Sequence, residues 1–124
     1  MSDSRMRVPD ENHPITITPT GSRVTVTWNG KVIADTTGAL SLAESTYPVV
    51  HYIPRKDVAP DILEGSDHTT YCPFKGTASY FSLSGDGGRD ENAVWYYADP
   101  YDAVSAIKDH VAFYPNAVDA IEVA

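Results

Sequence analysis

One short stretch constrains the fold more than any other, because the dipeptide Asn29-Gly30 stands between two runs of alternating residues. In residues 23–28, valine and tryptophan alternate with threonine, which is the period of a strand with one buried face. Both central residues of the commonest hairpin turn need a positive φ, which asparagine and glycine adopt readily. The sequence therefore predicts an antiparallel hairpin formed by residues 23–28 and 31–35.

Other short alternating runs, each bounded by proline, glycine or polar residues, predict further strands. They lie at residues 15–18, 40–44, 49–53, 69–72, 77–83, 93–97, 111–114 and 118–123. Their alternation places Phe81 and Leu83 on one face and Tyr80 on the other, and it places Trp95 beside Tyr97. The predicted class is therefore mainly β, a sandwich or small open barrel of antiparallel sheets.

The segments between these strands predict one helix and two long connections. Asp99-Pro100 is typical of a helix start, with Asp99 as N-cap, and apolar residues at helical spacing extend a short helix over 100–109. Residues 84–92 contain three glycines and no large apolar side chain, so we expect a flexible polar loop. Residues 55–66 are expected to form a long connection.

Length and composition indicate one domain. The chain has 124 residues, enough for a single core. Residues 1–14 are polar and without a period, so we expect a flexible arm, followed by a single β domain over 15–124. The single cysteine excludes an internal disulfide and a cysteine-based structural zinc site within one chain.

Charge and hydropathy limit the classes of molecule that the protein is expected to bind. The net charge is −8 and the basic residues are scattered, which argues against nucleic acid. We see no stretch apolar enough to cross a bilayer, so we expect a cytoplasmic protein that does not bind membranes. His51, His68 and His110 match no common zinc spacing, so neither a metal nor a cofactor is expected.

The segment Cys72-Pro73-Phe74-Lys75-Gly76 reads as a tight turn between two strands. Pro73 restricts Cys72 to an extended conformation, and Gly76 can supply a positive φ. A lysine close to a thiol can lower the pKa of that thiol if the side chains converge. A lone cysteine is also typical of a small buried apolar residue, so both interpretations of Cys72 stay open.

Three functional hypotheses follow. The first is a small-molecule binding module, since pockets are mostly apolar with a few placed polar groups. Its predicted ligand-binding residues are Glu44, Tyr52, Asp57, Tyr80, Trp95 and Tyr97, with Lys75 as a further polar partner. The second is a thiol-dependent enzyme, with Cys72 and Lys75 as catalytic residues and His51 or Glu44 as the base. The third is an interaction protein, such as a homodimer formed through exposed aromatic residues.

Several of these residues recur in motifs that resemble a known family. The matching pieces are Glu44, Tyr47-Pro48, Tyr52-Ile53-Pro54, Asp57-Val58, Thr70, Cys72-Pro73-Phe74-Lys75-Gly76, Ala78, Tyr80, Ala93, Trp95, Tyr97, Pro100 and Val111-Ala112-Phe113-Tyr114. Over about residues 23–123 the chain resembles the domain of unknown function 427 family. The resemblance implies a single β domain of the β-tent type, in which two sheets meet like the sides of a tent.

Two further implications of the resemblance concern chemistry. Relatives of the β-tent fold include zinc-bound ligand-binding domains and sulfoxide reductases, but this chain lacks paired Cys-x-x-Cys ligands, so a zinc role is not carried over. The family is also filed under a nucleotidyltransferase heading. Such enzymes need a Gly-Ser turn that opens a helix and paired carboxylates, whereas Gly21-Ser22 lies in a predicted hairpin turn and the sequence places no paired carboxylates on a nearby strand. The sequence therefore argues against nucleotidyl transfer.

Overall fold

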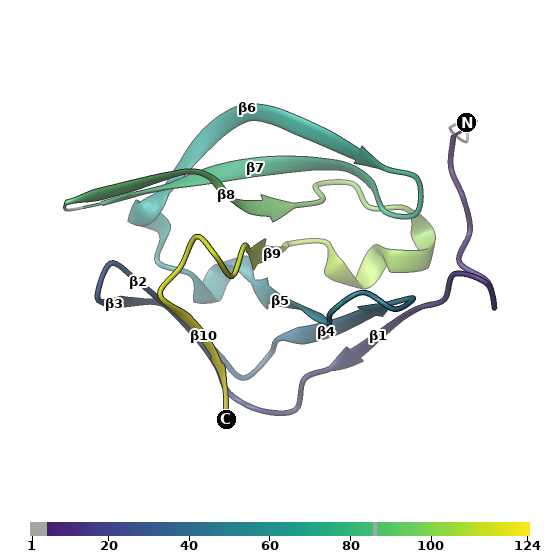
Figure 1. The fold of residues 1–124 in the computed structure, drawn as a ribbon, viewed down its shortest axis with the longest axis horizontal. Coiled ribbons are helices and arrows are strands. Elements are labelled where there is room, and N and C mark those ends of the chain that lie inside the picture. The colour runs from purple at the N-terminus through teal and green to yellow at the C-terminus, as the bar shows by residue number, and fades with distance from the viewer. Residues whose placement is uncertain (1–4, 86) are drawn as a thin grey trace.

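The computed structural model describes residues 5–85 and 87–124 of the chain (Figure 1). These residues form ten strands in two antiparallel sheets, joined by short connections and 3₁₀ turns. The mainly β class predicted from the alternation is therefore confirmed. No helix in this described part is long and apolar enough to cross a membrane.

The smaller sheet contains the predicted hairpin. Its strand order is β10 (Ala120–Val123), β2 (Val24–Trp28) and β3 (Lys31–Thr36). Asn29 and Gly30 both have positive φ, at 51° and 78°, and Trp28 pairs with Lys31 across the turn. The Asn-Gly signal therefore gave the correct turn and the correct register at the turn.

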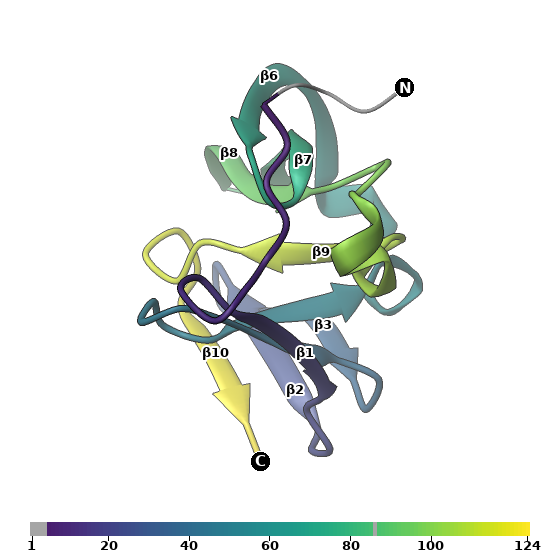
Figure 2. The ribbon, with the colours of Figure 1, turned by 90° about the vertical axis from the view of Figure 1, so that its right-hand side faces the viewer.

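The larger sheet has seven strands. Their spatial order is β1 (Ile15–Pro19), β4 (Leu40–Glu44), β5 (Val50–Pro54), β9 (His110–Phe113), β8 (Gly88–Tyr96), β7 (Gly76–Gly85) and β6 (Leu63–Cys72). The sheet is strongly bent, so that β6–β8 lie above β4 and β5 in Figure 1, with the 3₁₀ turn η3 (Asp102–Ile107) at one end between them. Figure 2 shows the smaller sheet below the bend.

The bent sheet separates two apolar cores. The inner core contains Leu42, Tyr52, Ala78, Tyr80, Tyr97, Val104, Ile107 and Ala112, and the outer core includes Val24, Val26, Trp28, Ile33, Ile53, Phe81, Leu83, Val94, Val111 and Phe113. Neighbouring residues of one strand enter different cores, since Tyr80 of β7 belongs to the inner core and Phe81 to the outer core. The outer core also receives the buried residues of β2 and β3 from the smaller sheet, while Val104 and Ile107 of η3 fill the inner core. The predicted alternation of faces in β7 and β8 is confirmed, because Trp95 and Tyr97 both belong to the inner core.

The predicted helix at 100–109 is only a 3₁₀ segment. It covers Asp102–Ile107, its N-cap is Tyr101 rather than Asp99, and no side chain caps it. Val104, with a φ of −126° and a ψ of 24°, is not helical and divides the segment into two short turns. Val104 and Ile107 are both fully buried, so the apolar spacing reflects core packing, but the backbone does not continue as an α-helix and Val111 already belongs to β9.

The predicted loop at 84–92 is wrong, because most of this segment belongs to β7 and β8. Leu83 pairs with Asp90, and Gly85 pairs with Gly88. The absence of a side chain at Gly85 allows the Trp28 ring to pack closely against the strand, since a Cβ on Gly85 would lie 3.2 Å from that ring. The polar composition reflects strands whose ends are exposed to water.

The predicted long connection at 55–66 is also shorter than expected. It consists of the two 3₁₀ turns η1 (Arg55–Asp57) and η2 (Pro60–Ile62), and β6 already begins at Leu63. An edge strand with both faces exposed needs no apolar alternation, and β6 also carries a register shift between Gly65 and Thr69. This explains why the first half of β6 gave no strand signal.

Candidate functional site

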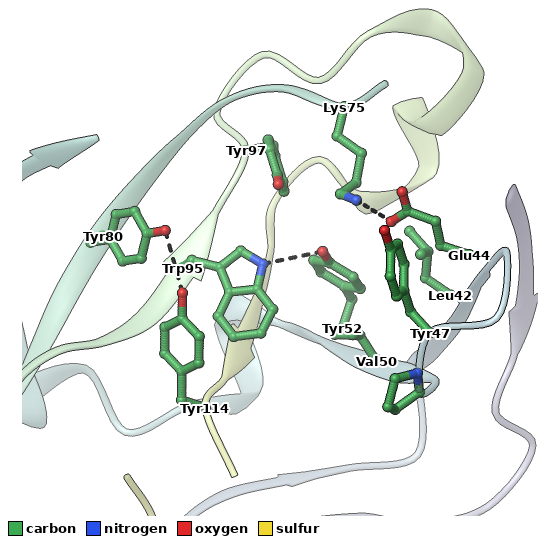
Figure 3. A pocket seen from close by; sticks show the side chains of 11 residues that line it. Leu42, Glu44, Tyr47, Val50, Tyr52, Lys75, Tyr80, Trp95, Tyr97 and Tyr114 are labelled. Carbon is green, nitrogen blue, oxygen red and sulfur yellow. Dashed lines mark hydrogen bonds and ion pairs between the residues drawn. The ribbon is translucent and has the colours of Figure 1, made fainter. Parts of the chain in front are cut away.

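A cavity of about 240 Å³ lies between the two halves of the bent sheet (Figure 3). Strands β4 and β5, with the loop between them, form one wall, and the other is formed by residues of β7 and β8 and by residues just outside β7, β8 and β9. The lining residues are mostly aromatic or aliphatic: Leu42, Glu44, Tyr47, Pro48, Val50, Tyr52, Lys75, Tyr80, Trp95, Tyr97 and Tyr114. They come from segments far apart in the chain.

The β6–β7 turn delivers a lysine to this cavity. The backbone N–H of Lys75 donates to the carbonyl of Cys72 at 3.3 Å, and Gly76 follows with a φ of 107°. The predicted tight turn is therefore confirmed. The lysine side chain is 11% exposed, and its Nζ donates to Oε1 of Glu44 at 2.6 Å. A cation and an anion are thus paired with little access to water.

The N-terminal arm contributes a second partner of Glu44. Nε2 of His13 donates to Oε2 of Glu44 at 2.7 Å, and the imidazole stacks on the Phe74 ring with centroids 4.1 Å apart. Burial by itself raises the pKa of the Glu44 carboxyl, but hydrogen bonds from Lys75 and His13 outweigh burial and hold that pKa below its ordinary value. Glu44 is therefore ionised at neutral pH.

Aromatic side chains form the rest of the cavity wall. The Trp95 indole N–H donates to the Tyr52 hydroxyl at 3.2 Å, and the two rings meet edge to face. Tyr80 and Tyr114 share a hydrogen bond of 3.4 Å between their hydroxyls, and the Tyr114 ring packs against Trp95. These contacts fix the orientation of the rings without filling the space between them.

The Tyr97 hydroxyl differs from its neighbours. The residue is 6% exposed, and its hydroxyl points towards the space near Lys75 in Figure 3. Among residues 5–85 and 87–124 this hydroxyl has no hydrogen-bond partner. Burial raises the pKa of Tyr97 above its ordinary value, so the group is a neutral donor and acceptor at physiological pH.

Burial acts in the same direction on two other tyrosines of the wall. It raises the pKa of Tyr52, and it raises the pKa of Tyr114 to about 12, helped by the Tyr80 hydroxyl. The cavity therefore presents neutral phenols beside a single ion pair.

A comparison with family models identifies the family of the chain. The model described as Domain of unknown function (DUF427) matches residues 16–124. The chain belongs to the DUF427 family. A search of curated proteins found no match. The match covers every residue that lines the cavity, and the family membership predicted from the Cys-Pro-Phe-Lys-Gly motif is confirmed.

Most of the residues predicted from the sequence meet in this DUF427 cavity. Glu44, Tyr52, Lys75, Tyr80, Trp95 and Tyr97 all line it. Cys72 does not line it, since the partly buried cysteine packs against the inner core. Asp57 lies in η1, where its carboxylate accepts a hydrogen bond from Thr36 at 2.7 Å, and His51 is hydrogen bonded to Ser41. The functional roles assigned to these residues remain predictions.

The sequence interpretation missed six residues of this site: the lining residues Leu42, Tyr47, Pro48, Val50 and Tyr114, and the Glu44 partner His13. Tyr47, Pro48 and Tyr114 belong to the quoted DUF427 motifs but were assigned to breaks and strand ends. His13 lies in the N-terminal arm and gave no local signal, because its partners Glu44 and Phe74 are distant in sequence. Within the described residues, no group of three or more His, Cys, Asp or Glu side chains could hold a metal ion.

Proposed function

We propose that this cavity binds a small, neutral, planar molecule that carries a hydrogen-bond acceptor. Its ring would lie among Tyr52, Trp95 and Tyr97, and its acceptor would face Lys75 and the Tyr97 hydroxyl. The observation that carries the proposal is the Tyr97 hydroxyl, which faces the cavity and has no hydrogen-bond partner among the described residues, although the residue as a whole is only 6% exposed. The hydroxyl is therefore open to the cavity, where it can form a hydrogen bond with a ligand, and placed polar groups of this kind give an apolar pocket its specificity.

The volume supports a ligand built on one ring. An apolar cavity of roughly 150 Å³ is enough to hold benzene. The present cavity is about 240 Å³ and therefore has room for a ring with one polar substituent.

The charges favour a neutral ligand. Lys75 is the only cation among the lining residues, and Glu44 already neutralises it. The ammonium group has three donors, of which Glu44 accepts one, so donors remain for a carbonyl or hydroxyl oxygen. An anionic ligand would add a second negative charge beside Glu44 without a second cation among the lining residues, and a cationic ligand would face Lys75.

The alternatives have less support. A thiol-dependent reaction would need Cys72 to reach the ligand, and Cys72 is not among the residues that line the cavity. A homodimer stays a prediction, and so does each catalytic role of Lys75. No observation at this site favours nucleotidyl transfer.

The two tryptophans provide the test. Trp95 lines the cavity, whereas the Trp28 indole donates to Asp90 in the outer core, so Trp28 is an internal control. Three probes of similar size and different charge are titrated against the indole N–H signals in ¹H–¹⁵N spectra: benzamide, benzoate and benzylammonium. We expect benzamide to shift the Trp95 signal saturably, to leave Trp28 in place, and to bind more tightly than either charged probe.

Two variants complete the test. Tyr97→Phe removes the unpaired hydroxyl with little change of shape, and we expect it to weaken benzamide binding about five- to tenfold, the worth of one hydrogen bond. Tyr96→Phe removes the hydroxyl of a tyrosine that packs against the outer core and does not line the cavity, so it is the matched control and should bind like the wild type. Absence of a Trp95 response to all three probes would refute the proposed function.

A further inference from the structure

A second hollow adjoins the cavity. It is a groove of about 590 Å³ between the β4–β5 loop on one side and the β9–β10 segment on the other. Its lining is mostly apolar: Glu44, Tyr47, Pro48, Val49, Val50, His51, Trp95, Phe113, Pro115, Ile121 and Val123. Five of these, Glu44, Tyr47, Pro48, Val50 and Trp95, also line the cavity, so the two hollows share walls.

Half of the exposed large apolar side chains in the described part of the chain line this groove. The described part of the chain has six large apolar side chains with high exposure. Three of them, Tyr47, Val49 and Val123, line the groove, and a fourth, Tyr114, lines the adjoining cavity. Four of these six side chains therefore lie at the two adjoining hollows.

We propose that the groove binds an apolar tail that belongs to the same ligand as the ring in the cavity. This inference rests on the proposed function, and it makes the ligand class amphipathic: a neutral ring with an acceptor at one end and an apolar chain at the other. The polar groups of the groove, Glu44 and His51, come from the strands that bear the cavity wall, while the β10 side of the groove contributes only Ile121 and Val123. An apolar tail matches that distribution.

The shared walls favour a small molecule over another protein as occupant. Tyr47 is 61% exposed and stands between the two hollows, so a chain that leaves the cavity beside Tyr47 enters the groove directly. A tail bound there would cover Val49 and Val123, whose exposure is otherwise unfavourable. A second copy of the chain is the competing occupant, and the experiment below separates the two.

The test is a chain-length series on one ring. Benzamide and its 4-methyl, 4-propyl and 4-pentyl derivatives are titrated against the wild type, and 1-pentanol serves as a tail without a ring. Each methylene that enters an apolar site contributes a factor of roughly four in affinity. We expect the dissociation constant to fall by about two- to fourfold per carbon through the series.

Two exposed valines allow a matched pair of variants. Val49→Asp places a charge in the groove, and Val32→Asp places the same charge on the exposed face of β3 in the other sheet. We expect Val49→Asp to flatten the chain-length dependence while leaving benzamide itself unchanged, and Val32→Asp to behave like the wild type. Light scattering on the same samples reports the oligomeric state.

The outcomes separate the two proposals. Benzamide binding without any chain-length dependence overturns the groove inference and leaves the proposed function in place. Pentanol binding that Val49→Asp abolishes, with no benzamide binding, retains an apolar site but overturns a shared ligand. If the wild type is a dimer and Val49→Asp dissociates it, the groove is an interface with a second copy of the chain, and the inference is overturned as well.

Discussion

Lys75 and Glu44 form an ion pair whose side chains are 11% and 13% exposed, whereas Arg89 and Glu64 form a pair that is about half exposed. Breaking a buried pair leaves an uncompensated charge, while an exposed partner is stabilised by water. We expect Lys75→Met to lower the free energy of unfolding by roughly 2–4 kcal/mol at neutral pH. Chemical denaturation measures the change.

Arg89→Met is the matched control for that substitution, because it also replaces a cation of an ion pair by methionine. We expect a loss of less than about 1 kcal/mol, since exposed pairs contribute little. Equal losses in the two variants would show that the Lys75–Glu44 pair is as solvated as the surface pair.

The pKa of Glu44 gives a prediction with a definite sign. Its folded-state pKa lies below the ordinary value of 4.5, so the folded protein binds its proton less tightly than the unfolded chain. The stability that Glu44 contributes is complete above about pH 4.5 and is lost as the pH falls through the lowered pKa. We therefore expect wild type to exceed Glu44→Gln in stability at pH 7, and the difference to shrink below about pH 4.5.

Urea denaturation of both proteins between pH 7 and pH 3 checks this. Glu64→Gln is the control, since Glu64 is a half-exposed glutamate in a surface pair. A difference between wild type and Glu44→Gln that stays constant, or grows, as the solution becomes more acidic would contradict the assigned direction.

At the scale of elements, the β6–β7 turn places Lys75. Gly76 has a φ of 107°, a backbone conformation that residues with a Cβ rarely adopt, so alanine is strained there although its Cβ would make only an ordinary contact of 3.5 Å with the Asp99 carbonyl oxygen. We expect Gly76→Ala to cost about 1–3 kcal/mol and to weaken benzamide binding, because the lysine moves with its turn. The melting temperature and the Trp95 titration measure the two effects.

Gly65→Ala in the neighbouring edge strand is the control, since its φ is not positive and no atom lies within 4 Å of the new Cβ. It should change stability by less than about 0.5 kcal/mol. A Gly76→Ala protein that is as stable as Gly65→Ala would show that the turn tolerates another backbone conformation.

The elements differ in how far the sequence could predict them. Asn29-Gly30 predicted the hairpin correctly, because the preference of these two residues for a positive φ does not depend on the rest of the fold. Strand β7 was predictable because its alternating residues pack into two different cores. The segment at 84–92 failed because its glycines allow close packing of Trp28 and were interpreted as flexibility. The first half of β6 failed because an exposed edge strand shows no apolar period.

The candidate site was predictable in part for the same reason. Two features of the site are local in sequence. Trp95 and Tyr97 are two residues apart in an extended segment and so share a face, and Lys75 lies in a tight turn. The sequence could therefore indicate which of these side chains lie on the same side. The contact of His13 with Glu44 depends on how the arm passes the β6–β7 turn, where the Arg7 N–H donates to the Pro73 carbonyl at 2.8 Å. No short-range pattern encodes such a contact.

At the scale of the whole molecule, the two cores have different structural roles. The outer core joins the two sheets, while the inner core carries the cavity. Leu83 is fully buried in the outer core, so we expect Leu83→Ala to lower the free energy of unfolding by about 2–5 kcal/mol. Benzamide affinity of the folded variant should stay within twofold of wild type.

Val32→Ala, at a residue that is 60% exposed, is the control and should leave stability nearly unchanged. Denaturation and the Trp95 titration are measured on both variants at a temperature where each is folded. Loss of binding in folded Leu83→Ala would show that the two cores are coupled rather than separate.

The central claim is that a ring occupies the cavity between Tyr52, Trp95 and Tyr97 with its acceptor near Lys75. A crystal structure with 4-bromobenzamide tests it directly, because anomalous scattering locates the bromine and thereby the ring. We predict the ring in this cavity, the amide oxygen within hydrogen-bond distance of Lys75 or the Tyr97 hydroxyl, and the bromine on the groove side. Bromine found only at other places on the protein, with the cavity free of the ring, would contradict the account.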